Sequence, residues 1–493
     1  MSFLLTIYPG PVQTGILFTK NNNKKAVDTR EELLYSKIIL LGKIGEIYLI
    51  NEEIMDKYEI IKILKDWNFW ERDLNTGFDR PYYLNKLKSF MESSHIIVIS
   101  GARRSGKSFI MRQMVKSLIR EGISKNSTLT VNFEDPRFVE RDTETLQKIY
   151  EAYLEFLNPR ERPHLFLDEI QEVEDWERWV RSIHELDKAK IVISGSNARL
   201  LSKELSTLLT GRHLDLVTFP LSFREYLAFK GINLEDKIEL INKELEIKRL
   251  LRECLEFGSF PEVVLGGEKK QILLNYFEDI LNKDLVRRFK IRKTRELTAL
   301  AKFYLSNISS LITFSSLEKS LNISADTIEK FSAYLEDTYI LFFLKRFSYK
   351  VREQEKSSRK VYAIDVGLAN TIGFRFGQNL GRLMENFVFL ELRRKTILNP
   401  DWELYYWKDV NHQEVDFVIK ENLKVKQLIQ VSWKVDRLET KKREIRSLLK
   451  AMKEFDLERG LVITDDYEAE ENIKGKKIEY IPLWKWLLIN GNK

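Results

Sequence analysis

The sequence has a single cysteine among its 493 residues, Cys254, and is poor in glycine (21) and proline (10). A single cysteine excludes an intrachain disulfide and a zinc site built from several cysteines, and it fits a reducing cytosol. Long apolar runs are missing as well, because the longest near the start, 37–50, is interrupted by Lys43 and Glu46 and falls short of the roughly 20 residues of a membrane span. Residues 1–8 lack the basic n-region of a signal peptide. We therefore expect a cytoplasmic protein without membrane contact.

A strong excess of either charge is also absent. The 81 lysines and arginines nearly balance the 74 acidic residues, which leaves a net charge of +7. This balance permits contact with nucleic acid but does not require it. Apolar residues make up 43% of the chain, which excludes a disordered class and predicts packed cores. The length exceeds what one hydrophobic core can use, so we expect about three domains.

Short apolar runs alternate with helical patterns between residues 95 and 220. Such alternation predicts an α/β fold, with a parallel sheet covered by helices on both faces. The runs lie at 96–99, 129–133, 165–167, 191–193 and 214–219. Beyond Pro220 the pattern is helical to about residue 345, and from residue 360 onward helices and strands are mixed.

A P-loop motif, Gly-x4-Gly-Lys-Ser, follows the first of these strands and opens a helix. Its glycines allow backbone amides to turn toward phosphates, and the helix N-terminus adds partial positive charge. Lys107 is expected to reach the β- and γ-phosphates of ATP, and the Ser108 hydroxyl to bind Mg²⁺. We assign nucleotide binding to Gly101, Ala102, Arg103, Arg104, Ser105, Gly106, Lys107, Ser108 and Phe109.

Two adjacent carboxylates, Asp168 and Glu169, follow the apolar run 165–167. Asp168 is suited to hold Mg²⁺ with Ser108, and Glu169 is suited to polarise the attacking water. The alternative is an ordinary solvated acidic turn. A glutamate at this place favours hydrolysis of ATP over binding alone.

Two more polar residues complete the predicted catalytic set. Asn197 follows the run 191–193 and is a candidate to orient the water, although a simple asparagine turn is the alternative. Arg212 precedes the last strand and is a candidate to stabilise charge on the transferred phosphoryl group. It would act in cis or from a neighbouring subunit of a homo-oligomer, and the alternative is a surface arginine in a salt bridge.

The segment 313–347 predicts a helix–turn–helix followed by a strand that could serve as a wing. Ser324 is placed to cap the second helix, which carries four acids and a single base, Lys330. Like charge disfavours insertion of this helix into a DNA groove, so we expect a structural or protein-contacting module. Basic clusters at 283–295 and 345–360 leave contact with phosphate backbone as an alternative to solvated surfaces.

Short motifs spread over most of the chain carry a family resemblance. They are the P-loop and the segments Leu64–Trp70, Val131–Pro136, Leu167–Gln171, Ser194–Asn197, Phe219–Phe223, Gly258–Glu262, Gly381–Asn386 and Glu414–Phe417. With them, residues 66–433 resemble the AAA-type ATPases of archaea and bacteria that join a P-loop domain to a C-terminal domain of unknown function.

The resemblance implies an additional-strand, AAA-type P-loop core, a helical lid, a winged helix and a restriction-endonuclease-like α/β tail. We expect these at 55–220, 221–295, 296–360 and 361–493. The lid contains no Gly-Ala-Arg, so the lid arginine of many AAA proteins has no candidate. Residues 1–54 precede the family pattern, and we hypothesise a dispensable extension with Met55 as the initiator.

The tail matches the nuclease pattern only in part. Glu385 and Asp416 stand at the positions of the helix and strand acids, but the third strand offers Gln430 and Ser432 where an acid and a lysine are expected. Lys434 is offset by two residues. A pocket that lacks one carboxylate binds Mg²⁺ weakly, and without the lysine it does not stabilise the charge that develops during phosphodiester cleavage. We therefore expect the tail to bind a nucleic acid or a protein and not to cleave nucleic acid.

The sequence as a whole predicts an Mg²⁺-dependent ATPase that moves its appended domains, with a protein or nucleic-acid partner left open. Two alternatives remain. One is a nucleotide-gated binding switch with little turnover, and the other is an ATP-regulated nuclease.

Overall fold

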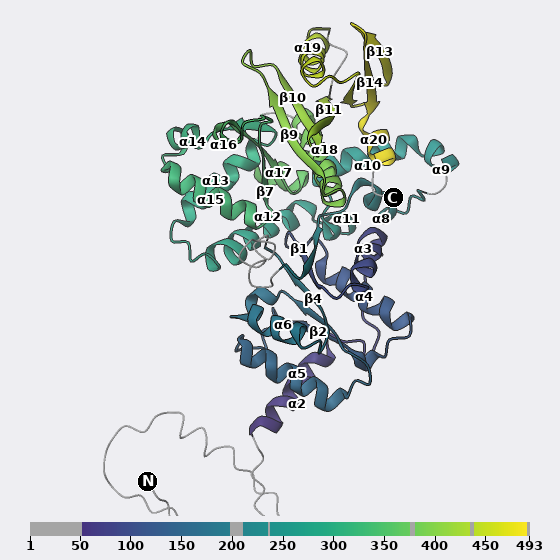
Figure 1. The fold of residues 1–493 in the computed structure, drawn as a ribbon, viewed down its shortest axis with the longest axis vertical. Helices are drawn as coiled ribbons and strands as arrows, with labels where there is room; N and C mark the ends of the chain where they lie inside the picture. Colours follow the sequence, from purple (N-terminus) through teal and green to yellow (C-terminus); the bar gives the residue numbers. More distant parts are fainter. Residues whose placement is uncertain (1–51, 198–210, 235–236, 375–379, 434–437, 491–493) are drawn as a thin grey trace, which may run out of the picture. The chain divides into compact units, whose positions relative to one another are not determined.

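The structure is a computed structural model, and it describes residues 52–197, 211–234, 237–374, 380–433 and 438–490. The chain divides into two units, Met1–Glu59 and Ile60–Lys493. Of the predicted extension 1–54, residues 1–51 lie outside the described residues, and Met55 lies in helix α2 (Glu52–Lys65). Figure 1 shows the helices and strands of the second unit, coloured along the sequence.

A five-stranded sheet with the order β2-β3-β4-β1-β5 forms the first layer of this unit. All neighbouring strands run parallel, which confirms the predicted α/β core. The strands are β1 (Ile96–Gly101), β2 (Thr128–Asn132), β3 (His164–Asp168), β4 (Lys190–Gly195) and β5 (His213–Thr218).

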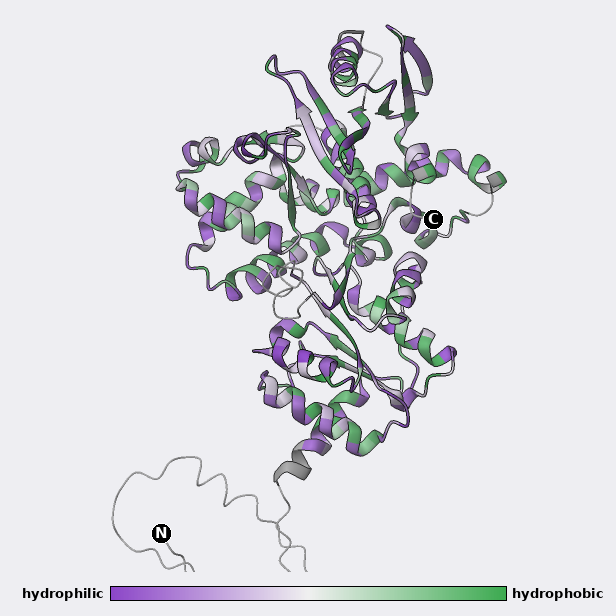
Figure 2. Ribbon diagram, viewed as in Figure 1, coloured by the Kyte–Doolittle hydropathy of each residue, from purple (hydrophilic) through white to green (hydrophobic). Residues whose placement is uncertain are grey.

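Helices cover both faces of this sheet because side chains alternate along each strand. Ile97 and Ile99 pack with α3 (Pro81–Met91) and α4 (Lys107–Arg120), whereas Ile96 and Val98 pack with α5 (Thr143–Leu157) and α6 (Trp176–Glu185). The strands are therefore apolar on both sides, and Figure 2 shows them largely hydrophobic while the helices carry stripes of both kinds.

Helices follow the sheet, as predicted. They are α8 (Phe223–Phe229), α9 (Lys237–Asn242), α10 (Glu244–Phe257), α11 (Pro261–Leu265), α12 (Lys269–Asp279), the π-helical segment η4 (Ile280–Arg287) and α13 (Thr294–Ser306). The helix–turn–helix prediction is met by α14 (Phe314–Leu321) and α15 (Ala325–Asp337), and β7 (Leu341–Leu344) follows. Strand β7 joins β6 (Ser310–Ile312) and β8 (Arg359–Ala363) in an antiparallel sheet, beside α16 (Val351–Lys356) and α17 (Val366–Ile372).

The tail is a mixed six-stranded sheet with the order β13-β14-β12-β11-β10-β9. Its predicted elements are present as α18 (Leu380–Leu398), β9 (Trp402–Lys408), β10 (Glu414–Glu421), β11 (Lys424–Ser432), α19 (Leu438–Glu454) and β12 (Arg459–Thr464). The structure adds β13 (Ala469–Ile473), β14 (Lys476–Pro482) and α20 (Leu483–Asn490).

One large hydrophobic core joins the helical, middle and tail segments that follow the five-stranded sheet. It joins residues of α10, α13, α15, β8, α18 and α20, from Phe219 to Leu487. The expected boundaries at 295/296 and 360/361 fall inside α13 and β8. The segments expected as lid, winged helix and tail thus share one continuous core. The tail has a second core of its own, formed by strand residues such as Val415 and Leu428 and by Leu448 of α19.

In the described ranges, no helix has the length and apolarity needed to cross a membrane.

Candidate nucleotide-binding site

The P-loop begins where β1 ends, and two glycines shape it. Gly101 has φ +146, and a Cβ there would lie 2.2 Å from the Thr218 carbonyl oxygen of β5, so only glycine fits. Gly106 has φ +98 and is the N-cap of α4. The loop therefore turns from strand to helix as the motif predicts, and the first amides of α4 have no partner within the helix.

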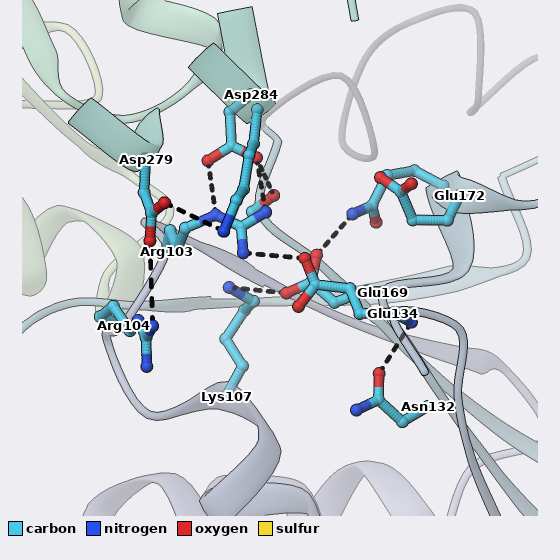
Figure 3. Close-up of polar contacts among 12 residues, drawn as sticks. Arg103, Arg104, Lys107, Asn132, Glu134, Glu169, Glu172, Asp279 and Asp284 are labelled. Carbon is cyan, nitrogen blue, oxygen red and sulfur yellow. Dashed lines mark hydrogen bonds and ion pairs between the residues drawn. The ribbon is translucent and has the colours of Figure 1, made fainter. Parts of the chain in front are cut away.

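Lys107 is buried and its ammonium faces the acid that follows β3. Its Nζ atom donates to the carbonyl oxygens of Gly101 (3.2 Å) and Ala102 (3.3 Å) and lies 3.3 Å from Glu169 Oε1 (Figure 3). The structure thus brings together the predicted phosphate-binding lysine and the predicted water-activating glutamate.

Asp168 lies beside Ser108 at the carboxyl end of β3. It accepts a hydrogen bond from the Ser194 hydroxyl of β4. Burial, followed by the charge of Glu169, raises the pKa of Asp168, whereas hydrogen bonds from Ser108 and Ser194 oppose the shift. A buried carboxylate next to a hydroxyl is a donor pair that Mg²⁺ accepts together with phosphate oxygens.

Glu169 adopts a left-handed conformation, with φ +54, that turns its side chain toward the P-loop. Burial alone would raise the pKa of Glu169, but the charge of Lys107, a hydrogen bond from Gln171 and the charge of Arg103 lower it. The carboxylate is therefore held in its ionised form, which a general base requires.

The tip of β4 supplies Ser196 and Asn197, both buried. Parallel strands end at one edge of the sheet, so Asn197 lies at the same edge as Asp168 and the P-loop. The neighbouring Ser196 hydroxyl donates to Asp284 Oδ1 (3.2 Å) in η4.

Arg212 lies at the other edge of the sheet. Its carbonyl oxygen accepts from the amide of Ile96, the first residue of β1, roughly 16 Å along the strand from Gly101 at about 3.3 Å per residue. Its exposed guanidinium lies 3.5 Å from Glu185. The expected role in cis is therefore wrong, because the side chain cannot span the sheet. A role from a neighbouring subunit stays a prediction.

Two arginines at the site were not given a role by the motifs. Arg80, which is buried, donates to the Ser105 carbonyl (2.8 Å) in the P-loop, to the Phe219 carbonyl (3.0 Å) after β5, and to both carboxylate oxygens of Glu225 in α8. The only signal for it in the sequence is its position before Pro81, at the start of α3. Arg103, assigned only to the nucleotide-binding set, pairs with two acids, Glu134 and Asp284.

In the tail, Glu385 of α18 and Asp416 of β10 meet as the family pattern predicts, but a lysine lies between them. Lys360 of β8 places Nζ 3.0 Å from Glu385, 2.7 Å from Asp416 and 2.7 Å from Glu414. The expectation of a pocket without a lysine is therefore wrong, because the cation comes from a strand outside the motif. Gln430 donates to Glu444 (2.6 Å) of α19, and Lys434 lies outside the described residues.

The fold and this site define a AAA-type P-loop NTPase domain, a nucleotide-binding class. Three family models match the chain: an AAA domain at residues 93–227, a domain of unknown function at 248–379, and a second domain of unknown function, DUF4143, at 380–486. The chain is 35% identical over 455 residues to the uncharacterized protein MJ1544 of Methanocaldococcus jannaschii, covering 89% of this chain and 95% of that protein. It therefore belongs to this family of AAA-domain proteins, in which two domains of unknown function follow the P-loop domain.

An uncharacterized protein of Haemophilus influenzae is 29% identical over 416 residues, covering 82% of this chain and 98% of that protein. Among solved structures, AMPPCP-bound DnaA of Aquifex aeolicus is 16% identical with a TM-score of 0.24, covering 56% of this chain and 92% of that chain. A DNA polymerase III gamma subunit-related protein of Thermotoga maritima is 15% identical with a TM-score of 0.26, covering 52% and 99%.

Proposed function

We propose that the protein is an Mg²⁺-dependent ATPase. The observation that carries this proposal is the meeting of Lys107, Ser108, Asp168 and Glu169 at one edge of the sheet. Lys107 and the α4 amides bind the β- and γ-phosphates, and Ser108 and Asp168 hold Mg²⁺, which when bound neutralises charge on those phosphates. Glu169 accepts the proton of the attacking water, and Asn197 orients that water.

Phosphate release by the wild type and by Glu169→Gln tests this proposal. The amide keeps the shape of the side chain but cannot take up a proton, so we expect turnover to fall at least about 100-fold while ATP binding is retained. Glu172→Gln, at the neighbouring but partly exposed acid, is the matched control and should keep its turnover. Phosphate release by Glu169→Gln at the wild-type rate would refute the role, and a wild type that binds ATP without releasing phosphate would favour the nucleotide-gated switch.

The domains that follow the core serve as the moving part in this proposal. We assign lid, winged-helix and nuclease-like functions to the segments 221–295, 296–360 and 361–493, and all three share one core. Helix α15 carries Asp326 and Glu329 toward solvent, which favours a protein contact over insertion into a DNA groove.

We also propose that the nuclease-like pocket does not cleave nucleic acid. Its centre is filled by the Lys360 ammonium, which donates to three acidic side chains, Glu385, Glu414 and Asp416. Burial and then the charge of Asp416 raise the pKa of Glu385 to about 8, so Glu385 is neutral at pH 7. Lys360 and Lys408 then balance Glu414 and Asp416. A pocket with balanced charge has little attraction for a divalent cation.

A further inference from the structure

Arg103, the third residue of the P-loop, is held by two acids from different parts of the chain. Its Nε and Nη2 atoms donate to Asp284 at 2.9 and 3.0 Å, a bidentate pair, and Nη1 lies 2.8 Å from Glu134 (Figure 3). The side chains of Arg103 and Asp284 are 11% and 3% exposed. A buried bidentate pair of this kind is strong and geometrically specific.

Arg103 also faces the place where the γ-phosphate must lie. That place is bounded by Lys107, which reaches the phosphates, and by Glu169, which activates the water that attacks the γ-phosphorus. The Arg103 cation acts on the Glu169 carboxylate, and Figure 3 shows Arg103, Lys107, Glu134 and Glu169 converging on one space. A P-loop arginine therefore lies within reach of the terminal phosphate while it is bound to the lid.

Asp284 connects Arg103 to the segments that follow the sheet. It lies in η4, a π-helical segment, and such segments are rare and frequently occur at functional sites. It also accepts from Ser196, the neighbour of Asn197. The η4 residues Ile280, Leu281 and Leu285 belong to the core that continues into the tail.

We propose that Arg103 is a γ-phosphate ligand that exchanges its bond to Asp284 for a bond to ATP, so that ATP but not ADP loosens the attachment of η4 to the P-loop. The proposal rests on the proposed ATPase site and adds its regulation. A terminal phosphate carries about two negative charges and three acceptor oxygens, so it competes with the Asp284 carboxylate for the Nε and Nη2 atoms of Arg103. ADP has no terminal group there and leaves the Arg103–Asp284 pair intact.

Equilibrium binding of a non-hydrolysable ATP analogue and of ADP, each with Mg²⁺, tests the exchange by calorimetry. Arg103→Ala should weaken the ATP analogue about 10- to 100-fold, the value of a charge-assisted hydrogen bond, and weaken ADP less than about threefold. Asp284→Asn should raise the affinity for the ATP analogue relative to that for ADP, because the side chain that competes for Arg103 has lost its charge. Arg103→Lys keeps the charge without the fork and should fall between wild type and Arg103→Ala.

Asp279→Asn is the matched control, since Asp279 is a lid carboxylate that contacts Arg104 at 3.9 Å and Lys283. It should leave the ratio of the two affinities unchanged. Hydrogen–deuterium exchange of the wild type should rise in residues 280–287 with the ATP analogue and not with ADP.

Equal weakening of both nucleotides by Arg103→Ala, or by Asp284→Asn, would overturn the exchange and leave the pair a structural contact. Equal hydrogen–deuterium exchange of η4 in the wild type with the ATP analogue and with ADP would also overturn the proposal. This measurement does not depend on whether the variants fold. A wild type that binds neither nucleotide would instead refute the proposed function itself.

Discussion

Replacing Lys360 by methionine tests how the tail pocket is balanced. Methionine keeps most of the length of the side chain but removes the ammonium that contacts Glu385, Glu414 and Asp416 at 2.7–3.0 Å. Lys360 is 2% exposed, so water cannot replace the lost cation. Removing one partner of a buried ion pair costs about 3–5 kcal/mol, because the other charges stay buried and uncompensated. At about 2–4 °C per kcal/mol for a cooperative unit of 150–250 residues, the melting temperature should fall by about 6–20 °C.

The assay is thermal unfolding of the full chain, followed by circular dichroism at pH 7. Lys408→Met is the control, since Lys408 pairs with Glu414 at 3.4 Å but is 24% exposed, and its loss should cost about 1 kcal/mol or less. Adding Asp416→Asn to Lys360→Met should restore part of the lost stability. If Lys360→Met costs no more than Lys408→Met, the pocket is not held by a buried cation and the reasoning fails.

Three other predictions concern single sites. Lys107→Ala should abolish ATP binding or hydrolysis, because it removes the P-loop cation aimed at the phosphates; turnover within threefold of wild type would refute the assignment. If Arg212 acts across a subunit boundary, mixing inactive Arg212→Ala with inactive Lys107→Ala should restore some phosphate release; a stable oligomer that stays inactive after mixing would exclude this. Because the pKa of Glu385 is raised to about 8 from 4.5, the folded state holds a proton that the unfolded state releases. Stability should therefore fall as pH rises from about 4.5 to 8, and a Glu385→Gln variant with the same slope would contradict this.

The sequence was informative where the chemistry is local. The P-loop, the acid pair after β3 and each strand of the core lie in a few consecutive residues. Motifs and periodicity therefore predicted these strands and helices, and they predicted that the P-loop and the acid pair meet at the same edge of the sheet. The placement of Arg212 could also have been predicted, because it directly precedes β5 and the residues before a parallel strand lie at the edge opposite the P-loop. The parallel pairing of Ile96 with His213 confirms that edge.

Contacts between distant residues could not be predicted from one sequence. Arg103 and Asp284 are 181 positions apart, and Lys360 and Asp416 are 56 apart, with no motif that joins either pair. Strand β13 reads Ala-Glu-Glu-Asn-Ile, and its polar residues have low β-propensity. It forms because β14 pairs with it along its full length, which is a tertiary cause.

Under the proposed ATPase function, the shared core limits how hydrolysis can act on the segments that follow the sheet. Because η4, α13, β8 and α18 contribute to one hydrophobic cluster, separating the lid from the tail would expose buried apolar surface at about 25 cal/mol per Å². The links to the sheet combine a small apolar contact at Ala102 of the P-loop with the polar pairs Arg103–Asp284, Arg80–Glu225 and Ser100–Tyr339. Polar pairs can exchange partners with a phosphate at small net cost, whereas a packed core cannot. If the protein is the ATPase that we propose, we expect a change at the γ-phosphate to move the lid, the middle segment and the tail together against the sheet.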